Sequence, residues 1–217
     1  MEMLLAEVTI TVRMNGPYRL SGPFKLVDAE GNEIKIESER EFVALCRCGQ
    51  SANKPFCDGM HAKIDFSGEE VADRGPIARR RVAYQGKGVT IYDDRSVCSH
   101  AGHCTDNLAS VFKLDAEPWI DPEGAGREAI IEVVGSCPSG ALSYAEGDSA
   151  DPVEQEREPA ITRSKDGPYW VVGGIELQSA DGSTYERRAR YALCRCGGSK
   201  NKPFCDGTHW HISFKDG

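Results

Sequence analysis

Short apolar and β-branched runs, separated by stretches rich in glycine, proline and charge, form the dominant pattern of this chain. In the first and last thirds the runs are too short for helices, so they predict strands. Glu30–Asn32 and Asp181–Ser183 carry the residues of tight turns and predict hairpins. The predicted strands are Val8–Met14, Phe24–Val27, Phe42–Leu45, Tyr169–Val172, Ile175–Leu177 and Tyr191–Leu193.

The middle of the chain has a different pattern. Strand-like runs at Val89–Tyr92 and Ala141–Tyr144 enclose an extended Trp119–Ile120 segment and an apolar-rich helix predicted near Arg127–Val134. An acidic stretch with two prolines and no aromatic residue follows at 146–159, which is typical of a solvated linker. We therefore expect the middle of the chain to form a separate insert.

The strand pattern repeats because a whole segment is duplicated. Asn15–Tyr18 reappears as Asp166–Tyr169, and the sixteen-residue block Cys46–His61 reappears as Cys194–His209 with three differences. We refer to these two blocks as the first and second ligand blocks. The predicted domains are a first module (1–71), the insert (72–145), an acidic linker (146–159) and a second module (160–217).

Each ligand block is rich in glycine, proline and asparagine, which predicts an irregular loop. A short helix is predicted after Asp58 in the first block and after Asp206 in the second, with the aspartate as its cap. Cys57 and His61 would then share one helical face, because they are four residues apart. We expect each block to form a ligand loop beneath a small β-structure.

The cysteines indicate metal centres. Each ligand block supplies three thiols and one imidazole, a soft donor set that suits zinc or iron with sulfide. The nine cysteines form three triplets with none left over, and an odd number cannot pair fully into disulfides. We therefore expect a reducing compartment, the cytoplasm, and small domains whose folding depends on bound metal. The third triplet is Cys98, Cys104 and Cys137.

Composition narrows the classes of partner. The chain has 34 acidic and 26 basic residues, a net charge of -8, which argues against nucleic acid and favours weak docking of a basic partner. Its 40% hydrophobic content is ordinary for a globular chain, and no apolar run approaches the roughly 18 residues of a membrane helix. The first residues lack the basic start and apolar core of a signal peptide.

The ligand blocks resemble the CDGSH iron–sulfur family. That family's pattern is Cys-x-Cys, a serine three residues on, then Pro-x-Cys-Asp-Gly-x-His, and both blocks meet it, with Met60 and Thr208 in place of a serine that is not a ligand. The resemblance implies one [2Fe-2S] cluster per block and two modules paired in an intramolecular pseudo-dimer with a shared β-cap. Ligand type alone would also permit zinc. The implied ligands are Cys46, Cys48, Cys57 and His61 for the first cluster, and Cys194, Cys196, Cys205 and His209 for the second.

The insert resembles single-cluster bacterial ferredoxins. Cys98, Cys104 and the Cys137-Pro138 pair match their ligand spacing, but Ala101 stands where the second cysteine would be. Three thiolates with one iron corner open would suit a [3Fe-4S] cluster. The insert is also similar to a divergent single-cluster family usually assigned a [4Fe-4S] cluster, for which His100 or, less conveniently, His103 could supply the fourth ligand.

These patterns together predict an α+β fold of small metal-stapled domains, with two CDGSH modules and a ferredoxin-like insert. We expect a bacterial, cytoplasmic electron carrier that is a monomer with internal pseudo-two-fold symmetry. Its acidic surface would dock a basic redox partner weakly. The alternative is a protein that stores or transfers clusters to an apo-acceptor, or senses redox state. No complete dinucleotide fingerprint, hydrolytic triad or phosphate loop occurs, so we do not expect an enzyme.

Overall fold

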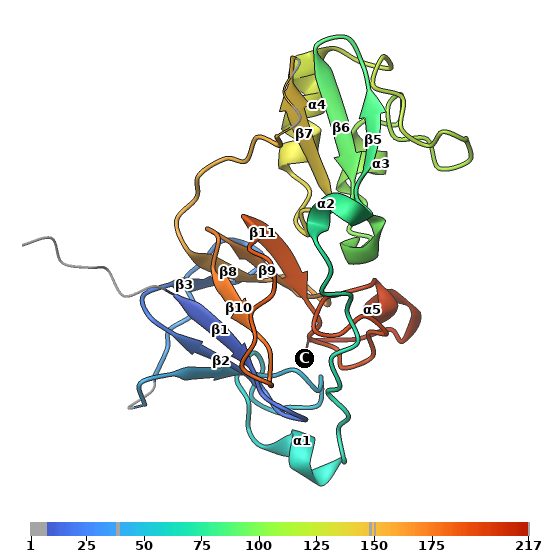
Figure 1. Cartoon of the computed structure of the whole chain (residues 1–217). Helices are drawn as coiled ribbons and strands as arrows, with labels where there is room; N and C mark the ends of the chain where they lie inside the picture. The colour runs from blue at the N-terminus through green and yellow to red at the C-terminus, as the bar shows by residue number, and fades with distance from the viewer. Residues whose placement is uncertain (1–7, 38–39, 148, 150, 217) are drawn as a thin grey trace, which may run out of the picture.

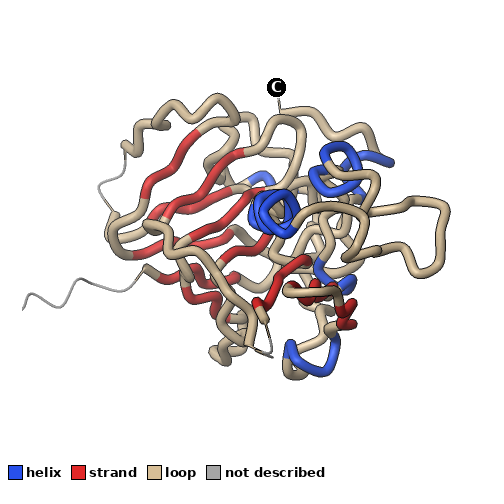
Figure 2. Tube along the Cα trace, turned by 90° about the horizontal axis from the view of Figure 1, so that it is seen from above, coloured by secondary structure: helices blue, strands red, loops and turns tan. Residues whose placement is uncertain are grey.

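The computed structural model describes residues 8–37, 40–147, 149 and 151–216. It is a small mixed α/β protein with three short-stranded sheets and short helices (Figures 1 and 2). Within the described part of the chain, no helix has the length and apolar character needed to span a membrane.

The first four-stranded sheet combines strands from both ends of the chain. Its order is β10-β1-β2-β4, with β1 (Thr9–Val12), β2 (Tyr18–Ser21), β4 (Val43–Leu45) and β10 (Glu176–Gln178). The three early strands pair antiparallel, whereas β10 pairs parallel with β1. Along β2 buried and exposed residues alternate, so one face of the sheet packs on the core. The first module thus receives one strand from the second.

The second sheet has the reciprocal composition. Its order is β11-β9-β8-β3, with β3 (Lys25–Val27), β8 (Ala160–Arg163), β9 (Tyr169–Val172) and β11 (Arg190–Leu193). Here β3, from the first module, pairs parallel with β8. Strands of three or four residues bury little apolar surface alone, and the exchange lets both sheets share one core. Neither sheet is complete without the other module.

The insert has its own sheet at the top of Figure 1. Its order is β5-β6-β7, and α4 packs against β7. Its strands are β5 (Val82–Gln85), β6 (Val89–Asp93) and β7 (Leu142–Glu146), and its helices are α2 (Ile77–Arg80), the 3-10 turn η1 (Arg95–Val97), α3 (His103–Asn107) and α4 (Arg127–Gly135).

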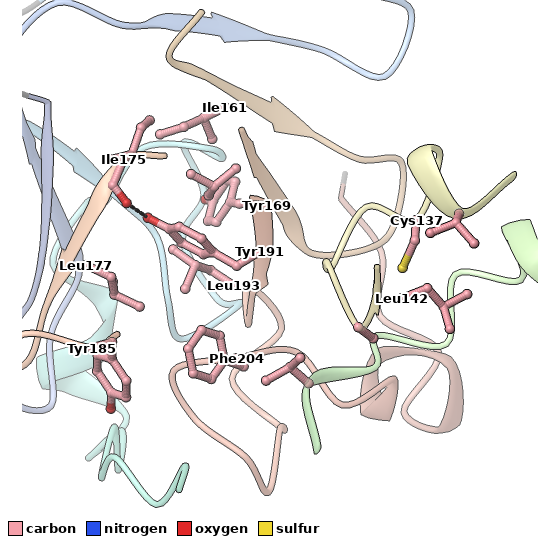
Figure 3. Close-up of a cluster of buried hydrophobic side chains, with 14 of the residues drawn as sticks. Cys137, Leu142, Ile161, Tyr169, Ile175, Leu177, Tyr185, Tyr191, Leu193 and Phe204 are labelled. Atoms are coloured by element: carbon pink, nitrogen blue, oxygen red, sulfur yellow. Dashed lines mark hydrogen bonds between the residues drawn. The ribbon is translucent and has the colours of Figure 1, made fainter. Parts of the chain in front are cut away.

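The apolar core continues from the second sheet into the insert. Figure 3 follows it from Tyr191 and Leu193 on β11 towards Leu142 on β7. Arg190 of β11, 4% exposed, donates to the carbonyls of Val134, Gly135 and Leu142 at 2.8–3.1 Å. Its guanidinium also lies 3.7 Å from the carboxylate of Glu154. The hydrogen bonds of Arg190 fix the insert against the second module.

Most predicted strands are confirmed, and both predicted hairpins close through the bridges Val27–Glu33 and Gln178–Thr184. The sequence patterns did not predict β2, β5 or β8, and β10 begins one residue later than expected. Residues 148 and 150 of the predicted linker lie outside the described residues, and Val153 within it bridges to Tyr144.

The prediction that Asp58 and Asp206 occupy the N-cap positions of the two ligand helices was wrong. The helices α1 (Met60–Lys63) and α5 (Thr208–His211) follow Gly59 and Gly207, which occupy the N-cap with φ near +85°. Glycine adopts this left-handed conformation at little cost. Asp58, one residue earlier, still accepts from the first helical N–H at 3.0 Å, as Asp206 does in the second block.

Candidate metal centres

The first ligand block brings its four predicted donors together in two pairs. The Sγ atoms of Cys46 and Cys48 lie 3.7 Å apart, and Cys57 Sγ lies 3.4 Å from Nδ1 of His61. The expectation of a shared helical face was wrong, because Cys57 precedes α1. The turn through Asp58 and Gly59 brings its sulfur to the imidazole instead.

The second ligand block repeats this arrangement. The Sγ atoms of Cys194 and Cys196 lie 3.9 Å apart, and Cys205 Sγ lies 3.4 Å from Nδ1 of His209. Over the described residues, no group of three or more His, Cys, Asp and Glu side chains has the spacing that holds one metal ion. The donors of both blocks thus come in pairs.

The two ligand loops pack directly against each other. Gly49 and Gly197 follow the second cysteine of their blocks, each with φ of +79°. A Cβ on Gly49 would lie 2.5 Å from the carbonyl oxygen of Cys196, and one on Gly197 would lie 2.6 Å from that of Cys48. Because backbone, not a flexible side chain, would be struck, only glycine permits this approach.

Two buried tyrosines cross between the modules. The hydroxyl of Tyr18 lies 2.9 Å from the carbonyl oxygen of Cys194 and 3.0 Å from that of Pro203. The hydroxyl of Tyr169 likewise lies 3.0 Å from the carbonyl oxygens of Cys46 and Pro55. Their rings meet edge to face at 6.3 Å. Each module therefore holds the ligand loop of the other.

A buried arginine lies between the first two cysteines of each block, and the sequence patterns gave no signal for it. Arg47 donates to the carbonyls of Arg13 and Gly68, and no ion pair among the described residues includes it. Arg195, equally buried, is paired with the carboxylate of Asp216. Gly68 stands at the position that matches Asp216 in the repeat, so only the second guanidinium is neutralised.

We expect Asp216→Asn to raise the reduction potential of the second site by tens of millivolts. The substitution removes a negative charge while keeping the shape of the side chain. One charge within roughly 15 Å contributes on the order of 1 kcal/mol at an effective dielectric of about 20, which corresponds to tens of millivolts for one electron. A redox titration followed by electron paramagnetic resonance measures the change. Asp181→Asn, which removes an exposed carboxylate of the β10 hairpin, is the control and should leave the potential unchanged. Equal effects of both would refute the local charge argument.

The two blocks differ in burial although their sequences nearly match. Phe204, Cys205 and His209 are 2–4% exposed, whereas their counterparts Phe56, Cys57 and His61 are only partly buried. The insert causes the difference.

The insert reaches the second block through its η1 turn and the residues that follow it. The side-chain amide of Asn201 donates to the carbonyl of Ser96 at 2.6 Å, and the Trp210 ring nitrogen donates to that of His100 at 3.3 Å. In Figure 1, α5 accordingly lies near the insert and α1 lies at the far end.

Burial affects the titration of His209. Desolvation first, then the charge of Arg195, lowers the pKa of this imidazole below its ordinary value. The neutral form, which is the metal-binding form, is thereby favoured. Because the folded pKa lies below the unfolded one, the associated stability is present above about pH 6.5 and is lost as the pH falls through the folded pKa.

The third predicted site is a cavity of about 360 Å³ in the insert. Cys98, Cys104 and Cys137 line it together with Ala101, as the sequence predicts. The hydroxyl of Ser99, which also lines it, is buried without a hydrogen-bond partner. An orphaned buried donor facing a thiol-lined cavity fits a bound group that accepts hydrogen bonds, such as sulfide.

Both candidate fourth ligands lie at this cavity. His100 has a left-handed backbone, φ +53°, and His103 has Nδ1 3.0 Å from the carbonyl oxygen of Ser136. The His103 ring also contacts Trp170 of the second module at 5.7 Å. Among the described residues, the His100 ring packs against no aromatic ring, so His100 remains the first candidate for the fourth ligand of the central site.

The thiols favour a bound cation. Burial raises the pKa of Cys48 and of Cys104 to about 11, so without a compensating charge these thiols stay protonated at neutral pH. A coordinated metal ion supplies that charge and deprotonates the thiol. Every cysteine is free of disulfides in the described residues. The donor chemistry of all three sites therefore fits iron–sulfur clusters.

Comparison with known proteins agrees with this geometry. Residues 15–62 and 166–210 match the family described as iron-binding zinc finger, CDGSH type, and residues 84–147 match a divergent 4Fe-4S mono-cluster family. The chain is 34% identical over 61 residues to the uncharacterized protein YjdI of Escherichia coli K12, and equally to that of Escherichia coli O157:H7. These matches cover 28% of this chain and 80% of each relative.

Proposed function

Because the chain belongs to the CDGSH iron-binding family and carries a divergent 4Fe-4S mono-cluster domain between its two CDGSH modules, we propose that it is an electron-transfer protein. It would hold one [2Fe-2S] cluster in each ligand block and one cubane-type cluster in the insert. Bound clusters of these kinds supply one-electron chemistry. We propose no enzymatic activity and a role in the bacterial cytoplasm, where nine free thiols stay reduced.

The pairing of donors is the observation that carries the proposal. A two-iron cluster takes two protein ligands on each iron, and each block offers one cysteine pair and one cysteine–histidine pair. Zinc would instead draw four donors around one ion. The exchanged strands and crossed tyrosines support two modules paired about an internal pseudo-two-fold axis.

The charges and burial support a direction of electron flow. Arg47 carries an unneutralised charge beside the partly exposed first block, and both features stabilise added negative charge there. The second block is covered and its Arg195 is neutralised by Asp216. We propose that the first site has the higher potential and exchanges electrons with partners.

For the central site we propose a four-iron cluster, in keeping with the matched family, with His100 as the fourth protein ligand. The three-iron alternative follows from Ala101. Ala101→Cys should then leave the iron content of the site at four and alter its spectrum only slightly, whereas a three-iron site would gain one iron atom. Iron and sulfide analysis with low-temperature resonance spectra of the oxidised protein measures this. His103→Ala is the control: it should leave the iron content and the spectrum unchanged if His100, and not His103, is the fourth ligand.

Electron transfer and cluster transfer make different kinetic predictions. Protein isolated without oxygen should absorb in the visible and give reversible one-electron waves in film voltammetry. Its clusters should remain in place through many such cycles. A colourless preparation that holds only zinc would end the proposal.

A second candidate function, cluster delivery, is favoured by one observation. His61 is partly exposed and is the single non-thiolate donor of the first block, so that site is the one open to an acceptor. If apo-ferredoxin acquires clusters from the protein faster than electrons are exchanged, delivery is the better description.

A further inference from the structure

One residue of the insert touches both the central cavity and the second ligand block. His100 lines the cavity together with Cys98, which lies two residues before it in the chain. The imidazole of His100 also packs on Gly207. A Cβ added to Gly207 would lie 3.0 Å from Cδ2 and 3.1 Å from Cβ of His100, closer than an ordinary van der Waals contact. The His100 side chain and the backbone of Gly207 are therefore in direct contact.

Gly207 belongs to the loop that carries two of the proposed ligands of the second cluster. It lies between Cys205 and His209, and its N–H donates to the Sγ atom of Cys205 at 3.5 Å. A single backbone residue therefore lies between this sulfur and the ring of His100. The central and second sites are neighbours through this contact.

Trp210 holds the backbone of His100 in this position. Its ring nitrogen donates to the carbonyl of His100 at 3.3 Å, and the centroid of its indole lies 4.9 Å from that of the His209 ring. The position of Trp210 in the repeat is occupied by Ala62 in the first module. The two ligand blocks therefore differ in sequence where the insert meets the second one.

The matching glycine of the first block has no such neighbour. Gly59 has nearly the same backbone conformation as Gly207, with φ of +87° against +83°. A Cβ added to Gly59 would meet no atom of the described chain within 4 Å, apart from its own chain neighbours. Of the two glycines, Gly207 is thus the one that touches the central site.

We propose that His100 is the residue through which the central and second sites exchange electrons. Electron exchange between two bound centres slows steeply as the gap between them widens, and here packed atoms fill the gap. In this step the reduced central cluster loses one electron and the oxidised second cluster gains it, while no covalent bond of the protein forms or breaks. The proposal rests on the proposed electron-transfer function and adds a second role to the residue proposed as the fourth central ligand.

The test is the rate of this exchange in the full, cluster-loaded protein. A flash-reduced deazaflavin delivers single electrons, and rapid freeze-quenching with electron paramagnetic resonance follows the decay of the reduced central signal and the growth of the second-site signal. Iron analysis first confirms that each variant holds its clusters.

His100→Cys should keep four iron atoms in the central site, because a thiolate replaces the imidazole as ligand, but it removes the ring that packs on Gly207. The exchange should slow severalfold. The added thiolate lowers the potential of the central cluster and would by itself drive the electron more strongly towards the second site, so slower exchange points to the lost contact. His103→Ala removes the other imidazole of the cavity, which contacts Trp170, and should leave the rate unchanged.

A parental rate in His100→Cys, or equal slowing in His103→Ala, overturns the proposal. Spin relaxation in the parent protein is a second measure that needs no stable His100 variant. With all clusters reduced, the second-site signal should relax faster than the first-site signal, which is identified by its shift in His61→Cys. Equal relaxation of the two signals also overturns the proposal.

Film voltammetry of the same preparations keeps the two proposals separate. Reversible waves together with a failed exchange test leave the electron-transfer function standing and remove the role of His100. Exchange that depends on His100 in a protein without reversible waves keeps that role and removes the function.

Discussion

His61→Cys should lower the reduction potential of the first site by roughly 100–300 mV. A thiolate in place of a neutral imidazole adds one negative charge to the ligand set, and replacing two cysteines by two histidines spans about twice this range in the opposite sense. The pH dependence of this potential should also vanish, because a ligating imidazole can bind a proton when the cluster is reduced, whereas the cysteine that replaces it has no second nitrogen to do so. A slope near 59 mV per pH unit in the parent protein would therefore flatten.

Redox titrations between pH 6 and pH 8 measure both effects. His211→Ala is the control, because this exposed histidine follows His209 on α5 and is not a proposed ligand. It should change neither the potential nor the slope. An unchanged pH profile in His61→Cys would remove His61 from the ligand set.

The sequence could predict which proposed donors lie near one another because most of them are close along the chain. In each block the cysteines and the histidine fall within sixteen residues, and turns set by Gly59 and Gly207 bring them together. The central site spans more of the chain, yet its three cysteines still line one cavity because the spacing and the Cys137-Pro138 pair are specific. Spacing alone could not say which neighbours would surround them.

What the sequence could not predict depends on contacts between distant segments. Tyr18 reaches Cys194, and Arg190 reaches Gly135, at separations that no local pattern records. The strand β8, which the sequence analysis missed, lies directly after the acidic stretch. It has too few apolar residues to show the alternation that indicates a strand. Nor could two nearly identical blocks reveal that the insert would cover only one. The sequence did contain one sign that the two sites differ: Gly68 in the first module stands where the second module has Asp216.

Tyr18→Phe should destabilise the second site, although the substitution lies in the first module. It removes the hydroxyl shared between the carbonyls of Cys194 and Pro203 and leaves the Cys194 carbonyl buried without that donor. Such a loss costs about 1–3 kcal/mol, which corresponds to roughly a 5- to 150-fold faster loss of the second cluster if the cost falls on the bound state. Tyr169→Phe should do the same to the first site.

The crossing is what distinguishes this effect from general loosening. In a His61→Cys background, the remaining pH-dependent signal belongs to the second site, and chelator challenge followed by resonance spectroscopy then gives its rate of loss.

Tyr191→Phe is the matched control, because it removes a buried hydroxyl that donates to the carbonyl of Ile175 at 2.9 Å, away from both ligand loops. It should reduce the free energy of unfolding by a similar amount without favouring either site. Equal loss of both clusters in Tyr18→Phe would mean that the tyrosines support the shared core and do not hold the opposite loop. A selective effect would make the two modules one cooperative unit, in which neither site is fully formed by its own half of the chain.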